Sequence, residues 1–92
     1  MTKFSKEQNE LKMKEVRDFA ANTATGQYHL NLHVLGLNYS SKFAEMIKCY
    51  RSMARRFHPD KNIGLDTTEM MKMINEAKDV LEDTLRTNDA SR

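Results

Sequence analysis

The single proline of the chain, Pro59, places the strongest constraint on the fold. It follows a segment, from Ser41 to Phe57, that contains neither glycine nor proline. Proline ends a helix because its ring clashes with a carbonyl one turn back, and because it restricts the preceding residue to extended conformations. We therefore predict a helix that ends near Phe57. His58 should lie just past that end, with Asp60 two residues on, and both should be exposed in a short loop.

Two faces can be distinguished on this predicted helix, which Ser40 or Ser41 should cap. Apolar residues at spacings of three and four predict one buried face: Met46, Cys49, Met53 and Phe57. Basic residues at the same spacings form another face: Lys48, Arg51 and Arg55. From Lys42 to Phe57 there are five basic residues against Glu45 alone, although the net charge of the whole chain is only +2. Charge concentrated on one helix indicates an electrostatic docking face.

A second helix is predicted after the loop. Asp66, with Glu69 three residues later, matches a capping box, so we expect the helix to begin there. The apolar residues that follow keep helical spacing: Met70, Ile74, Ala77, Leu81 and Leu85. Because the connection is short, the two helices should pack antiparallel.

Two more helices are predicted before this hairpin. Residues 28–35 form a short one, with Leu32 and Leu35 on one side and Gly36 as its C-terminal stop. Residues 3–21 form an amphipathic helix, for which Ser5 and Gln8 are a candidate capping box. This helix is either a solvated extension or is docked on the body. In the docked interpretation, Val16 and Phe19 cover an apolar patch that includes Ile47.

No segment alternates as a strand would, so the predicted class is all-α. We expect an antiparallel helical hairpin, a short helix packed across it and an additional N-terminal helix. The predicted organisation is an extension with linker over residues 1–27, a body over residues 28–86 and a polar tail over residues 87–92. Four of the seven methionines fall at or near predicted core positions, where they fill gaps: Met46, Met53, Met70 and Met71.

Composition bounds the environment. One cysteine, Cys49, rules out an internal disulfide. The apolar runs are too short for a transmembrane helix, and the charged N-terminus has no apolar region of a secretory signal. We therefore expect a cytoplasmic or nuclear protein that acts as a monomer and does not bind membranes.

Three blocks of the sequence resemble J domains, the co-chaperone modules of the DnaJ class. Residues 50–62, Tyr-Arg-Ser-Met-Ala-Arg-Arg-Phe-His-Pro-Asp-Lys-Asn, resemble the second helix and His-Pro-Asp loop. Leu-Gly-Leu at 35–37 resembles the Leu-Gly-Val that ends the first J-domain helix. Ile-Asn-Glu-Ala-Lys-Asp-Val-Leu at 74–81 resembles the third helix. The three blocks stand in the family's order and spacing, and the resemblance covers roughly residues 31–86.

The resemblance implies a function and a set of site residues. J domains bind DnaK-type chaperones, the seventy-kilodalton heat-shock class, and stimulate their ATP hydrolysis without being enzymes themselves. A basic second helix meets an acidic surface of the chaperone, and the His-Pro-Asp loop contacts the junction between its domains. Clients would bind other parts of a longer parent protein. Carried over to this sequence, the chaperone-binding residues are Lys48, Tyr50, Arg51, Arg55, Arg56, His58, Pro59, Asp60, Lys61 and Asn62.

Five residues depart from the family pattern. Ile47 and Ser52 stand where the family often has exposed basic residues, and Arg55 stands where many members are apolar. Lys78 replaces a usual tyrosine and Met71 a usual phenylalanine. Ile47 and Ser52 reduce the number of basic residues on this face. The affinity for the chaperone or the choice of partner should therefore differ from that of typical members.

Parts of the sequence are also compatible with other binding functions. Phe43 and Phe57 on a basic amphipathic helix resemble some calmodulin targets, and a basic helix could enter a DNA groove. A J-like interaction module without ATPase stimulation is a further alternative. His29 and His33 could meet Cys49, but these make an incomplete metal site. The sequence has no phosphate-binding glycine loop and no nucleophile motif, so we predict neither an enzyme nor a cofactor.

Overall fold

The computed structural model describes residues 4–22 and 26–90, and every regular element in those ranges is helical. The elements are α1 (Lys6–Ala20), α2 (Gln27–Leu35), α3 (Phe43–Arg56), a short 3-10 turn η1 (Pro59–Lys61) and α4 (Thr68–Ala90). The predicted all-α class is therefore confirmed. No helix in the described ranges has the length and apolar character needed to span a bilayer.

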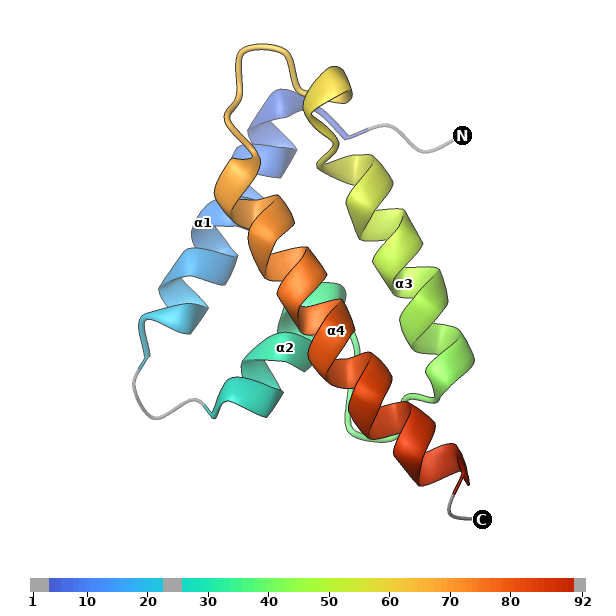
Figure 1. Cartoon of the computed structure of the whole chain (residues 1–92). Coiled ribbons are helices and arrows are strands. Elements are labelled where there is room, and N and C mark those ends of the chain that lie inside the picture. Colours follow the sequence, from blue (N-terminus) through green and yellow to red (C-terminus); the bar gives the residue numbers. More distant parts are fainter. Residues whose placement is uncertain (1–3, 23–25, 91–92) are drawn as a thin grey trace.

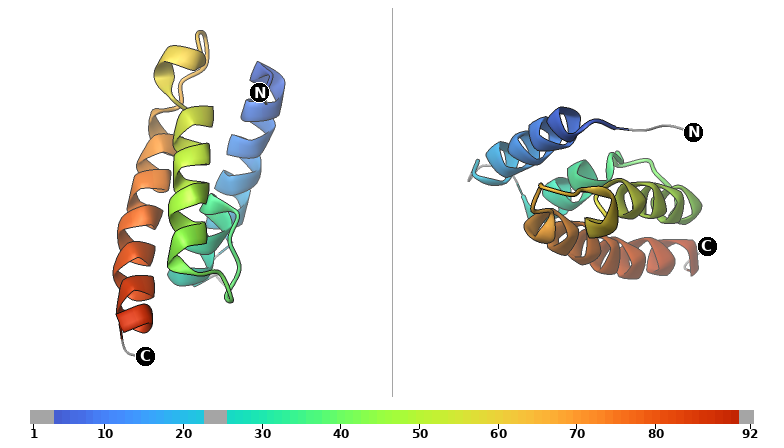
Figure 2. Two further views of the ribbon diagram at one scale, coloured as in Figure 1. Left: turned by 90° about the vertical axis from the view of Figure 1, so that its right-hand side faces the viewer. Right: turned by 90° about the horizontal axis from the view of Figure 1, so that it is seen from above.

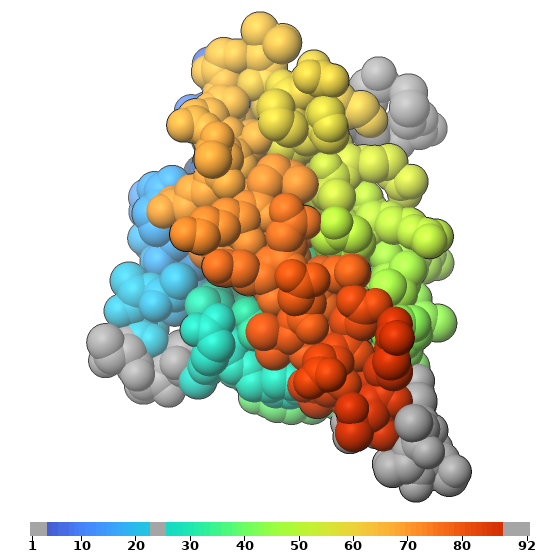
Figure 3. Space-filling view, viewed as in Figure 1, coloured from blue at the N-terminus to red at the C-terminus, as the bar shows by residue number. Residues whose placement is uncertain are grey.

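α3 and α4 run antiparallel and form the predicted hairpin, with η1 at the turn (Figure 1). α2 packs across the hairpin and contacts both of its helices. Figure 2 shows α1 on the far side of α2, with its N-terminal end beside the turn of the hairpin. In the space-filling view α4 covers the front face and α3 lies alongside it (Figure 3).

One hydrophobic core joins all four helices. α1 contributes Val16, α3 contributes Met46, and Phe57 lies at the C-cap of α3. The remaining buried apolar residues come from α2 and α4: Leu32, Val34, Leu35, Met70, Ile74, Ala77, Leu81 and Leu85. Cys49, Met53 and Met71 are half-buried against this core. Each apolar position predicted from helical spacing in the hairpin is thus buried or half-buried.

The predicted end of α2 is confirmed in detail. Gly36 has a φ of 77°, in the left-handed region that favours glycine. The next amide, that of Leu37, donates to the carbonyl of Leu32 at 2.8 Å, which closes a Schellman-type end. The capping box of α1 is also present, since Ser5 Oγ accepts from the Gln8 amide at 3.1 Å and Gln8 Oε1 accepts from the Ser5 amide at 2.8 Å.

The prediction that Ser40 or Ser41 caps α3 is wrong. Lys42 is the N-cap, and its amide donates to the Glu45 carboxylate at 3.2 Å. The two serines instead belong to a turn organised by Asn38, whose Oδ1 accepts from both hydroxyls at 2.7 and 3.3 Å. A short polar side chain that bonds a nearby backbone competes in this way with a capping role.

The start of α4 differs by a smaller amount. The helix begins at Thr68, and Asp66 Oδ1 accepts from the Thr68 amide at 3.0 Å. The predicted N-cap is therefore wrong by one residue: Thr67 precedes the helix, and its carbonyl accepts from the Met71 amide at 2.9 Å. Asp66 lies one residue earlier, and its hydrogen bond with Thr68 lowers the pKa of the Asp66 carboxyl. Glu69 does not complete the box, because its carboxylate lies 3.7 Å from Arg17 of α1.

The contacts of α1 favour the docked interpretation of this helix. Val16 is 0% exposed and lies in the common core. Phe19 does not cover an apolar patch as predicted, because its ring stacks on His33 of α2 at a centroid distance of 3.9 Å. Ile47 is half-buried against the core, but its contact with Val16 stays a prediction.

Candidate functional site

The loop that carries His58 forms because Pro59 ends α3. α3 ends at Arg56, and the Phe57 amide still donates to the Met53 carbonyl at 3.0 Å. His58 then turns to an extended conformation, with φ −61° and ψ 134°, as the residue before a proline must. Pro59 occupies the first position of η1, where its missing N–H costs nothing.

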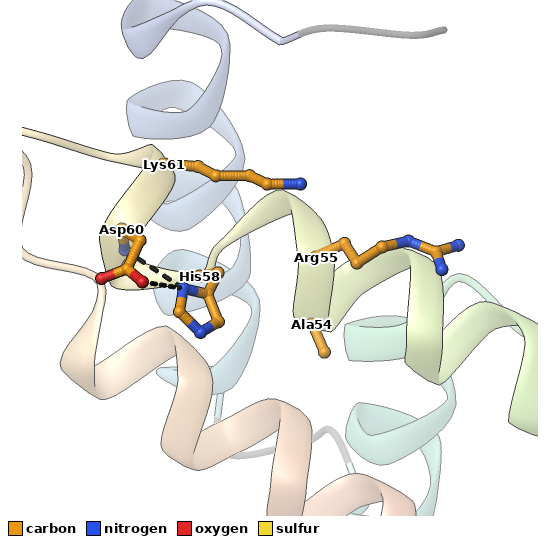
Figure 4. Close-up of a pocket in the computed structure, with 5 residues that line it drawn as sticks. All are labelled: Ala54, Arg55, His58, Asp60 and Lys61. Carbon is orange, nitrogen blue, oxygen red and sulfur yellow. Dashed lines mark hydrogen bonds and ion pairs between the residues drawn. The ribbon is translucent and has the colours of Figure 1, made fainter.

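His58 and Asp60 present their side chains to solvent, as predicted. Their side chains are 52% and 89% exposed, and the His58 ring lies 3.9 Å from the Asp60 carboxylate. The Asp60 amide donates to His58 Nδ1 at 3.1 Å, so this nitrogen carries the lone pair and Nε2 carries the proton in the neutral ring. Figure 4 shows Nε2 pointing away from Asp60.

A hollow adjoins these residues. It has a volume of about 300 Å³ and is lined by Ala54, Arg55, His58, Asp60 and Lys61. The Arg55 and Lys61 side chains extend outward from α3 and η1 (Figure 4). The loop, the end of the basic helix and both signs of charge therefore meet on one open surface.

Asn62 holds the loop from the inside. Its side chain is buried, and Nδ2 donates to the His58 carbonyl at 2.7 Å and to the Arg56 carbonyl at 3.1 Å. These bonds add a side-chain donor to two carbonyls just past the last hydrogen-bonded turn of α3, where helices leave acceptors without an intrahelical partner. The resemblance counted Asn62 among the chaperone-binding residues, whereas the structure places its side chain inward, as support for His58.

Arg56 also points inward, unlike the other basic residues of α3. Its guanidinium carbon lies 3.7 Å from the centroid of the Phe4 ring and 5.1 Å from that of Phe57, within cation–π range. Its Nε donates to Asn9 of α1 at 2.8 Å. Burial lowers the pKa of Arg56, because a desolvated charge is less favourable. The Arg56 guanidinium therefore makes its contacts mainly inside the domain.

The remaining basic side chains form the exposed basic face, which we define as Lys48, Arg51, Arg55 and Lys61. All four are exposed. Among the described residues, none of them has a carboxylate within the 4.0 Å of an ion pair. No described carboxylate therefore neutralises their charge, which is available to an acidic partner.

Tyr50 links the basic helix to α4. Its hydroxyl donates to Asn75 Oδ1 at 3.0 Å, and its ring is half-buried. Lys78, one of the departures from the family pattern, places its Nζ 5.7 Å from the Tyr50 ring centroid and 2.9 Å from Glu82. The hydrogen bond with Glu82 raises the pKa of Lys78. Lys78 thus neutralises an acidic residue of its own helix.

Two alternative interpretations can be set against this geometry. An anchor for calmodulin must be accessible, but Phe57 is 0% exposed in the core. The two histidines of α2 both stack on Phe19, at centroid distances of 5.5 and 3.9 Å for His29 and His33. His33 pairs with Glu15, and His29 with the Tyr39 hydroxyl at 2.8 Å. In the described ranges, no group of three metal-binding side chains includes them.

Comparisons with known proteins point to one family. The model of the DnaJ domain matches residues 32–88, more than half of the chain. "DnaJ homolog subfamily C member 5" from Xenopus laevis is 40% identical over 57 residues, which cover 61% of this chain and 29% of the frog protein. "Chaperone protein DnaJ" from Desulfitobacterium hafniense is 48% identical over 52 residues, 55% of this chain and 14% of that protein. No solved structure matches the chain significantly.

Proposed function

Because the chain belongs to the DnaJ domain family, we propose that it is a co-chaperone module that docks on a DnaK-type chaperone and stimulates its ATP hydrolysis. One observation carries the proposal: exposed His58 and Asp60 stand at the end of a helix whose basic face has no acidic partner among the described residues. A loop of this kind can act on a bound protein, whereas the residues around it offer no catalytic constellation of their own.

The two parts of the site would contribute differently. The exposed basic face supplies charge complementarity, which raises the association rate and sets the orientation of the complex. The loop supplies the contact that acts on the chaperone. Such a module can favour the hydrolysis-competent arrangement only through a higher affinity for it. Since Asn62 already fixes the loop backbone, little ordering free energy is needed on binding.

The proposal concerns the J domain alone. The chain spans 29% of the frog relative and 14% of the bacterial one, so its matched part corresponds to one module of those proteins. We propose that client binding resides outside this module, and that the partner chaperone is one of the cytosol or the nucleus.

The test is single-turnover ATP hydrolysis by a DnaK-type chaperone, with the wild-type domain and with His58→Gln. The wild-type domain should accelerate hydrolysis and the variant should not. Gln can still accept from the Asp60 amide, and the site is exposed, so the free energy of unfolding should change by no more than ~0.5 kcal/mol. Thermal melting of the same samples provides the control.

Three results would count against the proposal. A His58→Gln domain that stimulates like the wild type would show that the loop does not act on the chaperone. A variant that loses both stimulation and thermal stability would assign His58 a structural role instead. Salt-sensitive binding of the wild type to duplex DNA, without stimulation, would favour the nucleic-acid alternative.

A further inference from the structure

A buried polar group on α1 reaches the loop from outside the region that matches the family. Asn9 is 3% exposed, although asparagine is usually found at the surface. Its Nδ2 donates to Asn62 Oδ1 at 2.7 Å, and its Oδ1 accepts from Arg56 Nε at 2.8 Å. A single side chain of α1 therefore bonds both to the end of α3 and to the residue that holds the His58 carbonyl.

The chemistry of the partners fixes the orientation of both amides. Arginine has donors and no acceptor, so the oxygen of Asn9 must face Arg56. The side-chain nitrogen of Asn62 donates to the His58 and Arg56 carbonyls, so the side-chain oxygen of Asn62 must face Asn9. The arrangement is satisfied in this one way, and satisfied buried networks specify a single geometry. Phe4 covers the outer side by stacking on the Arg56 guanidinium at 3.7 Å.

We propose that Asn9 is a positioning residue for the His58-Pro59-Asp60 loop, and that the contacts of Asn9 and Phe4 with Arg56 and Asn62 brace that loop. The brace is defined as Phe4, Asn9, Arg56 and Asn62. Residues 4 and 9 lie outside the region, 32–88, that matches the family model. The inference rests on the proposed function, since positioning has an effect only if the loop acts on a chaperone.

The brace works through the backbone of the loop. When Asn9 is removed, the buried oxygen of Asn62 and the Nε of Arg56 lose their partner, which is costly for desolvated groups. Asn62 can then leave the His58 carbonyl more often, and η1 opens more often with it. The loop would still be exposed and would still carry its residues, but it would present His58 and Asp60 in the right place for a smaller fraction of the time.

The experiment compares Asn9→Ala and Asn9→Asp with two controls. Aspartate keeps an acceptor for Arg56 but has no donor for Asn62, so it separates the two contacts. Leu11→Ala, at a position 67% exposed on the same helix, controls for substitution on α1. Leu85→Ala lowers core packing in the C-terminal part of α4 and controls for stability. The loop adjoins the opposite, N-terminal end of that helix (Figure 1).

Two readouts are needed. The first is amide hydrogen exchange at Lys61 and Asn62, whose amides donate to the His58 and Pro59 carbonyls at 3.0 and 3.2 Å. Both Asn9 variants should speed exchange there by about tenfold, as the loss of a buried hydrogen-bond partner predicts. The second is maximal ATPase stimulation at saturating domain, which should fall in both Asn9 variants. The concentration for half-maximal effect should keep its salt dependence, and both controls should behave like the wild type in both readouts.

Three results would overturn the proposal. Unchanged exchange in Asn9→Ala would show that α1 does not hold the loop. An Asn9→Asp domain like the wild type in both readouts would show that the Arg56 contact alone matters. Faster exchange with full stimulation would show that the position of the loop is not limiting. If the wild-type domain itself gives no stimulation, the proposed function fails, and the brace is judged by exchange alone.

Discussion

At the scale of single residues, Arg55 and Arg56 are adjacent but have opposite roles. Arg55 is exposed on the basic face, while Arg56 lies within cation–π range of two aromatic rings and donates to Asn9. Arg56→Ala should therefore lower the free energy of unfolding by ~1–3 kcal/mol, from lost cation–π contacts and an orphaned buried amide. Arg55→Ala should leave it within ~0.5 kcal/mol. Chemical denaturation measures both.

Replacing Arg56 with lysine separates the role of its charge from that of its planar guanidinium. Arg56→Lys keeps the charge but loses the planar group that stacks on Phe4 and Phe57 and the Nε donor that faces Asn9. It should recover only part of the stability lost in Arg56→Ala. Full recovery would mean that only a positive charge is needed at position 56. Arg56 would then be assigned to chaperone binding.

Glu15 provides a pH-dependent contact between α1 and α2. Burial raises the pKa of its carboxyl, but hydrogen bonds from His33 and Lys12 outweigh this and lower it below the ordinary 4.5. A carboxyl whose pKa is lower in the folded than in the unfolded chain stabilises the fold when the pH is above the unfolded-state pKa. This stabilisation is lost as the pH falls through the folded-state pKa. Glu15→Gln should thus be less stable near neutral pH, and the difference should vanish in acid.

The size of this effect is limited by solvent. The Glu15 side chain is 46% exposed, so the difference should stay below ~1 kcal/mol. Glu10→Gln is a matched control, because Glu10 is exposed on the same helix and forms no ion pair with the described residues. Thermal melts from about pH 7 to about pH 3 measure both variants. A constant difference between Glu15→Gln and wild type across this range would contradict the assignment.

At the scale of elements, the predictions were right where one residue alone determines the end of a helix. The α2 end follows from Gly36 alone, and the α3 end follows from Pro59 alone. The α3 start was wrong because Asn38 competes for the serines through turn hydrogen bonds that spacing does not reveal. Local propensity fixes the ends of a helix only where no neighbouring side chain offers the backbone another partner.

The candidate site shows the same limit. Exposure of His58 and Asp60 was predictable, since a proline ends the helix beside them. The inward position of Arg56 was not, because its partners Phe4 and Asn9 lie about fifty residues away in the sequence. The one available signal was negative: helical spacing of three and four excludes position 56 from the basic stripe of Lys48, Arg51 and Arg55.

The basic face of α3 should be separable from the fold. Lys48→Glu combined with Arg51→Glu places like charges at the proposed interface, which should weaken chaperone binding several-fold or more. Both side chains are exposed and have no ion pair within the described ranges, so thermal stability should change little. The control is Lys14→Glu with Lys72→Glu, which changes the net charge equally at exposed positions on α1 and α4. Because Lys14 forms an exposed ion pair with Asp18 at 2.9 Å, the melting temperature of this control is measured as well.

Binding is measured by titration at several salt concentrations. The wild type and the control pair should lose affinity as salt rises, because exposed charges are screened beyond about 10 Å at 0.1 M. The reversed pair should bind weakly with little salt dependence. Unchanged affinity in the reversed pair would assign docking to another surface.

At the scale of the whole molecule, α1 determines how independent the 28–86 body is. Val16 is 0% exposed and shares one core with residues of α2, α3 and α4, so α1 is part of the folded unit. The polar contacts of Asn9 at one end and the Phe19–His33 stack at the other fix this helix along its length. Loss of its central apolar contact should therefore weaken the whole domain.

Val16→Ala tests this point directly. Removing two buried methyl groups and leaving part of their volume empty should cost about 2 kcal/mol. In a domain of this size, each kcal/mol shifts the melting temperature by roughly 4–8 °C, so the expected decrease is about 8–16 °C in a single transition. Leu11→Ala, on the exposed face of α1, should shift it little. If Val16→Ala melts like the wild type, α1 adds nothing to the stability of the core. If α1 melts separately at a lower temperature, it is a separate folding unit and cannot hold the loop in place.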